Sequence, residues 1–135
     1  MMKLYLAILA VPIGILAVAA APAVAHHSFG AEFDGDQPFE FTGTVTKIEW
    51  LNPHVYFYLD IEDEASGEVR TWAMEMGSPN GLMRRGWTRN SLRIGDEVSV
   101  AGSKARDGSD KGNARTVVLA SGRALFAGSS EDETP

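Results

Sequence analysis

The amino-acid sequence predicts an all-β domain with one short helix, and three observations lead to this prediction. Apolar and polar residues alternate in several short segments, which is the pattern of strands buried on one face. Glycine, proline and asparagine separate these segments. Only residues 77–86 carry helix-start signals, with Ser78 as the expected N-cap and Pro79 at the first helical position.

Five strands and a short sixth are predicted in order along the chain. The first, 39–50, alternates up to Val45 and then slips by one residue before Ile48. Such a slip predicts a β-bulge near Thr46 and Lys47. The remaining predicted strands are 54–63, 69–76, a fourth within 91–105 after a turn at Gly95–Asp96, 114–120 and the short 121–126.

The predicted order of elements places a short helix between the third and fourth strands. This order is typical of a small OB-like Greek-key barrel with five to six strands. Other small barrels and a curled sandwich fit the same pattern, because strand order is not readable from one sequence. We expect the odd-numbered residues of 55–61 to line the core together with Trp72, Met74 and Met76. The outer face would then carry His54, Tyr56, Tyr58, Thr71, Ala73 and Glu75.

The first 25 residues predict a signal peptide, and hence a periplasmic or secreted protein. They hold Lys3, a long apolar run and an A-x-A cleavage signal ending at Ala25. An uncleaved anchor is the alternative, since the run is long enough to span a bilayer, but Pro12 and Gly14 interrupt it and favour cleavage. The predicted organisation is a signal peptide (1–25), an irregular N-terminal arm (26–38), the OB-like domain (39–126) and a disordered acidic tail (127–135).

Charge and cysteine content narrow the classes of function. The chain has 12 basic and 18 acidic residues, and removing Lys3 with the signal peptide leaves 11 against 18, a net charge of −7. An acidic protein is a poor candidate for binding nucleic acid. There is no cysteine and hence no disulfide framework. The sequence shows no nucleophile triad, phosphate loop or dinucleotide fingerprint, so we expect a binding protein and no enzyme. We expect it to be a monomer or to associate weakly.

Several motifs together resemble a family of small exported bacterial proteins that is catalogued as a domain of unknown function. The motifs are AHHSF (25–29), WLNPH (50–54), Trp72 with Glu75, SPNGL (78–82), GW (86–87) and LRIGDEVSVAG (92–102). The resemblance covers nearly all of the chain that follows residue 25. It implies an exported small β-barrel, and it implies no activity.

The segment WAMEM (72–76) together with His54 has a weaker similarity to periplasmic copper carriers with OB-type barrels. That family binds Cu(I) with a histidine, a Met-x-Met pair and a nearby tryptophan, and Trp72 here is one residue closer to the pair. The similarity implies an alternative Cu(I) site of Trp72, Met74 and Met76 if the two thioethers face outward. The favoured interpretation places both methionines in the core, and a register change of one residue would exchange the two faces.

The adjacent histidines His26 and His27 lead to the main metal-binding hypothesis. Cleavage after Ala25 would make His26 the N-terminal residue, whose α-amine and ring would chelate one metal ion. Together with His27 and His54 this donor set suits copper as Cu(II), and zinc or nickel less selectively. Glu75 would supply a carboxylate ligand or fix a ring tautomer. The competing interpretation is a polar arm with solvated histidines.

A metal-free function is the alternative from another class. Tyr56 and Tyr58 would form a face that docks a peptide or a periplasmic protein partner. Equally, the N-terminal arm or residues 121–126 would cover one or both tyrosines. A third option is a copper- or zinc-dependent enzyme. A local basic cluster comprises Arg84, Arg85, Arg89 and Arg93. It would suit an anionic ligand or a lipid headgroup, but the favoured interpretation is the solvated side of the helix and its exit loop.

Overall fold

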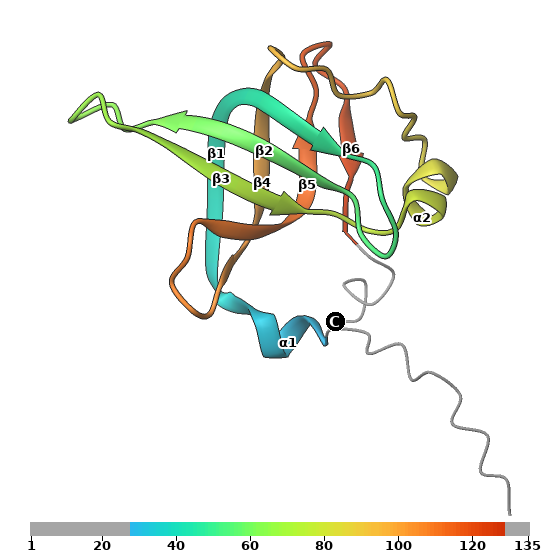
Figure 1. Cartoon of the computed structure of the whole chain (residues 1–135), viewed down its shortest axis with the longest axis horizontal. Helices are drawn as coiled ribbons and strands as arrows, with labels where there is room; N and C mark the ends of the chain where they lie inside the picture. The colour runs from blue at the N-terminus through green and yellow to red at the C-terminus, as the bar shows by residue number, and fades with distance from the viewer. Residues whose placement is uncertain (1–27, 129–135) are drawn as a thin grey trace, which may run out of the picture.

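The structure is a computed structural model that describes residues 28–128, and it confirms the all-β class (Figure 1). Strands make up most of the described chain, with one helical turn before the first strand and one short helix after the third. The elements are α1 (Phe29–Glu32), β1 (Phe33–Glu49), β2 (Tyr56–Glu62), β3 (Val69–Glu75), α2 (Pro79–Arg84), β4 (Glu97–Ala105), β5 (Lys111–Val118) and β6 (Ala124–Phe126).

The strands form one sheet that curls back on itself. Their order is β3-β2-β1-β4-β5-β6, with antiparallel pairing between these neighbours. An additional parallel pairing joins β3 to β5, from Ala73 opposite Lys111 to Glu75 opposite Asn113. Because this contact is short, the sheet is an incompletely closed form of the predicted barrel. The contact matters for the site, since it brings the start of β5 beside the end of β3.

The first strand contains the predicted bulge but begins earlier than predicted. The register with β2 moves from Val45 opposite Leu59 to Lys47 opposite Tyr58, so Thr46 is the extra residue. The irregular arm predicted for 26–38 is wrong from Phe29 onward, where a helical turn and then β1 are found.

The early start of β1 has a tertiary cause. Phe33 and Asp34 pair with Ala105 and Lys104 at the far end of β4, and pairing resumes at Pro38 opposite Ser103. The Asp34 carboxylate accepts hydrogen bonds from the Asp36 backbone amide and the Gln37 side chain, which stabilises the intervening irregularity. These bonds also lower the pKa of Asp34, together with the more distant charge of Arg106.

The short helix α2 forms as the sequence predicts. The Ser78 hydroxyl accepts a hydrogen bond from the Gly81 amide, and Pro79 occupies the first helical position. Gly86, with a φ of +96°, follows the end of the helix in a conformation that favours glycine. Leu82 is fully buried and anchors the helix to the core.

The core confirms the predicted faces of β2 and β3. Phe57 lies opposite Met74 and Leu59 lies opposite Trp72, and all four side chains are buried. The predicted odd-numbered row of β2 therefore does point inward. The fully buried members of the core include Val45, Val55, Phe57, Leu59, Met74, Leu82, Val100, Ala114, Val117 and Ala127.

The C-terminal part departs from the prediction at two boundaries. β5 begins at Lys111, three residues before the predicted strand 114–120, because the start of the strand pairs with both β3 and β4. The sequence places the start of the disordered tail at Ala127, and this is wrong for Ala127 itself. Ala127 is buried, its amide donates a hydrogen bond to the Arg115 carbonyl oxygen, and its carbonyl oxygen accepts one from the Gly77 amide. The rest of the predicted tail, 129–135, lies outside the described residues, as does the predicted signal peptide. Within residues 28–128, no helix is long and apolar enough to cross a membrane.

Candidate functional site

His54 lies just before β2, and its ring is held by the backbone of the next strand. Its Nδ1 is 3.0 Å from the Met76 carbonyl oxygen. Because a carbonyl oxygen only accepts, Nδ1 carries the proton and donates it, and in the neutral ring Nε2 keeps the lone pair. The His54 side chain is 20% exposed, so the ring is partly accessible to solvent.

Glu75 lies at the end of β3, beside His54, and is one of two buried polar residues in the described chain. Its Oε1 is 3.8 Å from the His54 Nδ1. Its Oε2 accepts a hydrogen bond from the hydroxyl of Tyr56, which lies directly opposite it in the β2–β3 register. Burial raises the pKa of Tyr56, and the hydrogen bond to the Glu75 carboxylate raises it further.

Lys111 connects this cluster to α1. Its ammonium is 3.5 Å from the Glu75 carboxylate and also donates a hydrogen bond to Glu32. It lies 5.4 Å from the ring centroid of Phe33 and 5.5 Å from that of Tyr56. Partial burial by itself lowers the pKa of Lys111, but the hydrogen bond to Glu32 and the two carboxylate charges outweigh it, and the pKa is raised.

The four side chains of Tyr56, Glu75, Lys111 and Glu32 form a continuous polar chain, which we call the β3–α1 clamp. It crosses from the sheet to the helical turn at the start of the described chain. Tyr56 contacts Glu75 and Lys111 within the clamp and is partly buried, and Glu32 of the predicted N-terminal arm reaches it only through Lys111. Sequence reasoning missed Lys111 and Glu32, because both lie in segments predicted to be irregular.

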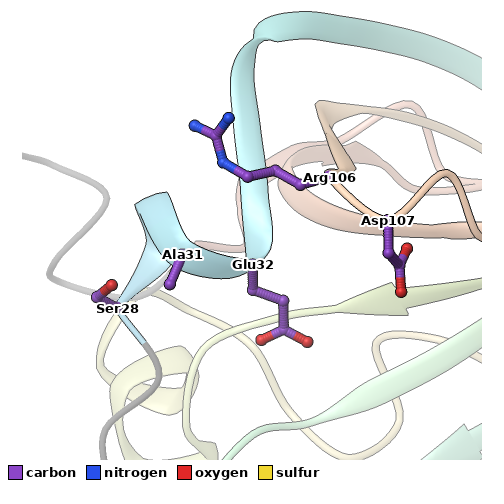
Figure 2. Close-up of a pocket in the computed structure, with 5 residues that line it drawn as sticks. All are labelled: Ser28, Ala31, Glu32, Arg106 and Asp107. Carbon is purple, nitrogen blue, oxygen red and sulfur yellow. The ribbon is translucent and has the colours of Figure 1, made fainter.

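A surface pocket of about 440 Å³ lies beside α1 (Figure 2). In Figure 2 the Glu32 and Asp107 carboxylates point to one side of it and the Arg106 guanidinium to the other. Arg106 donates a hydrogen bond to the Gly30 carbonyl oxygen at 2.7 Å, so it stabilises the α1 backbone. The lining residues are Ser28, Ala31, Glu32, Arg106 and Asp107.

The predicted metal ligands are only partly within the described chain. His54 and Glu75 are neighbours, as the outer-face prediction required. His26 and His27 precede the described residues, so their positions relative to His54 remain a prediction. Within residues 28–128, no three histidine, aspartate or glutamate side chains are grouped so that they could hold a metal ion.

The burial of the two methionines contradicts the alternative prediction of an outward-facing Cu(I) site. Met74 and Met76 are 0% and 1% exposed and belong to the core, and Trp72 packs against Phe41 with ring centroids 4.8 Å apart. His54 meets Met76 through the backbone carbonyl and not through the sulfur. Neither thioether is exposed on the outer face: Met74 points inward opposite Phe57 in the β2–β3 register, and Met76, just after β3, is buried as well.

Tyr58, the second residue of the predicted docking face, also has close partners. Its hydroxyl donates a hydrogen bond to Glu49 at 3.2 Å, and the Lys47 ammonium lies 4.9 Å from its ring centroid. The side chain is only partly buried. Of the two predicted tyrosines, Tyr58 is thus the one that lies outside the clamp.

Comparison with known proteins gives a family and no activity. None of the curated proteins matches the chain. One family model matches residues 13–114, which is more than half of the chain. It is described as a family of unknown function, so the predicted family resemblance is confirmed at that level. The chain belongs to this family of unknown function, DUF6152.

Proposed function

We propose that the protein is an exported binding protein that holds a transition metal, copper as Cu(II) first. The ligands would be the α-amine and ring of His26, the ring of His27 and the Nε2 of His54. The observation that carries this proposal is the hydrogen bond from His54 Nδ1 to the Met76 carbonyl oxygen. Histidines that bind metals nearly always donate their other ring nitrogen in this way, because the bond fixes the tautomer and the ring orientation.

Glu75 would act on the metal site indirectly. One of its oxygens already accepts from Tyr56 and faces the Lys111 ammonium. The other is 3.8 Å from the His54 Nδ1, where its negative charge would make the imidazole a stronger ligand. We therefore assign Glu75 a positioning role and not a place among the ligands.

The β3–α1 clamp supports the participation of the N-terminal histidines. It ties Glu32 to Glu75, which is the neighbour of His54. His27 is five residues before Glu32 in the chain, and five residues span at most about 17 Å. The clamp thus anchors the chain near His54 at a short distance in sequence from His26 and His27.

The decisive experiment compares Cu(II) binding by three proteins. The first begins at His26, the second carries one extra glycine before His26, and the third begins at His26 and carries His54→Gln. We expect the first protein to bind Cu(II) tightly. Binding is measured by calorimetry and by the Cu(II) electron paramagnetic resonance spectrum. The extra glycine removes the amine–ring chelate while keeping all three imidazoles, so affinity should fall and the spectrum should change. The His54→Gln variant should lose one nitrogen ligand.

The control is Tyr58→Phe, which changes the same outer face without touching a proposed ligand. It should bind Cu(II) as the unmodified protein does, and all variants should keep the same melting temperature without metal. Equal, weak binding by the first two proteins would refute the chelate. Absence of binding of any metal by the protein that begins at His26 would refute the metal function and leave a docking face at Tyr58, whose ring is only partly buried.

A further inference from the structure

A second pocket lies on the outer face of the sheet, over β1, β4 and β5. Its volume is about 540 Å³, within the range of pockets that hold small molecules. Ala101 of β4 lies opposite both Glu40 of β1 and Thr116 of β5. Ser103 of β4 lies opposite Pro38 of β1. Directly opposite residues share a face of the sheet, so the two small residues of β4 form a hollow floor between larger neighbours.

The two sides of this pocket carry opposite charges. Glu40 lines it from β1 and Arg115 from β5, and both residues are exposed. Arg115 is the extra residue of a β-bulge, because the register with β4 shifts between Ala101 and Gly102. Neither charged residue forms an ion pair within the described part of the chain. Because β4 lies between β1 and β5, the two backbones are about 10 Å apart, which leaves room for a ligand between the side chains.

Asn113, beside the pocket, has a buried amide without a protein partner. It is 6% exposed, and its side chain makes no hydrogen bond with any residue that the structure describes. Gly112 faces the core, where an added Cβ would meet Phe39, so the next residue, Asn113, points to the outer face. There it lies opposite Ser103, which lines the pocket. Buried amides normally have a hydrogen-bond partner, so this one indicates that a ligand supplies it.

We propose that this pocket binds a small zwitterion, namely a free amino acid. The carboxylate of the ligand pairs with the Arg115 guanidinium and accepts hydrogen bonds from the Ser103 hydroxyl and the Asn113 amide. Its ammonium pairs with the Glu40 carboxylate. A simple anion would meet the negative charge of Glu40 without compensation, and a simple cation would meet that of Arg115 in the same way. The pocket is separate from the proposed metal site, because His54 is not among its lining residues.

The test is a titration of the isotope-labelled protein with two zwitterions, followed by nuclear magnetic resonance. Glycine and 4-aminobutyrate carry the same two charges at a short and a long separation. At least one of them should shift the backbone amide signals of residues 38–40, 101–103 and 113–116. Acetate and methylammonium each lack one charge, so each should bind about tenfold more weakly or less. Absence of shifts with both zwitterions, or equal affinity for acetate, would overturn the proposal.

Substitutions at the two exposed charges test the pairing. Arg115→Gln and Glu40→Gln should each weaken binding of the zwitterion about tenfold, the loss expected for one hydrogen bond between charged groups. The matched controls are Arg93→Gln and Glu64→Gln, which remove the same charges at exposed positions outside the pocket. Both controls should bind as the unsubstituted protein does. Equal affinity of the Arg115→Gln and Arg93→Gln variants would refute the assignment of Arg115.

Asn113→Leu separates ligand binding from a structural role of the amide. Leucine is similar in size to asparagine and has no polar atom, and the substitution breaks no hydrogen bond within the described chain. The variant should therefore be at least as stable as the unsubstituted protein, while its affinity for the zwitterion falls about tenfold. A lower melting temperature together with unchanged affinity would show a structural amide and contradict its place in the binding site.

Discussion

Replacement of Lys111 by methionine tests the role of the β3–α1 clamp. The substitution keeps a long side chain beside Tyr56 and Phe33 but removes the ammonium that faces Glu75 at 3.5 Å. Glu75 is only 4% exposed, so its carboxylate would stay in the protein interior with a single strong partner, the Tyr56 hydroxyl. Glu32 would lose its bond to the same ammonium.

The magnitude follows from the burial of the two partners. Removing one partner of a buried ion pair costs about 3–5 kcal/mol, because the remaining charge is left without compensation. Lys111 retains 26% exposure, which screens part of its attraction, so we expect a loss of about 2 kcal/mol. For a domain of this size, that loss lowers the melting temperature by about 8–16 °C.

Thermal and urea unfolding, followed by circular dichroism, measure this loss at neutral pH. The double variant Lys111→Met with Glu75→Gln should be more stable than the single variant, because it buries no unpaired charge. The control is Lys47→Met, since Lys47 also pairs with a glutamate but is 58% exposed. If Lys111→Met and Lys47→Met lower the melting temperature equally, the clamp contributes no more than a surface ion pair.

Three further predictions concern single positions. Gly102→Ala places a Cβ 1.8 Å from the Asn113 carbonyl oxygen, so β4 and β5 must separate. We expect urea unfolding to show a free energy of unfolding lower by about 3 kcal/mol or more. Unchanged stability would contradict this close approach. Ser78→Ala removes the acceptor for the Gly81 amide and should cost about 1 kcal/mol in the same assay, with Ser78→Thr as the matched control that keeps the cap. The raised pKa of Tyr56 means that the folded state holds its proton above the ordinary value of 10.0, so its contribution is present below that pH and is lost as the pH rises further. Tyr56→Phe should therefore be less stable at pH 7, by about 1.5–3 kcal/mol, and lose less stability between pH 9 and 11; an unchanged alkaline loss would contradict this assignment.

Local patterns were sufficient to predict several elements. The one-residue slip after Val45 predicted the bulge at Thr46, because alternation has a period of exactly two residues. Ser78 and Pro79 predicted α2, because capping depends only on neighbouring residues. The alternation in β2 and β3 also placed Met74 in the core and Glu75 on the opposite face.

Two parts of the fold escaped prediction for physical reasons. Gly35 and Pro38 disfavour regular strand structure locally, but pairing of Phe33 with Ala105 extends β1 past them. Lys111 follows the charged and polar stretch RDGSD (106–110), which is typical of a loop. The parallel pairing with Ala73 nevertheless makes Lys111 the start of a strand. Both outcomes depend on partners that are distant in sequence.

The sequence by itself determined the all-β class, the capped helix and the pair of His54 and Glu75 on one face, because these follow from alternation and neighbouring residues. Only the tertiary structure decided that Glu75 is buried and that Lys111 joins it to Glu32. The reason is the closure of the sheet between β3 and β5, which brings an ammonium from one segment to carboxylates from two others. A buried carboxylate needs such a partner, and no local pattern shows where the partner comes from.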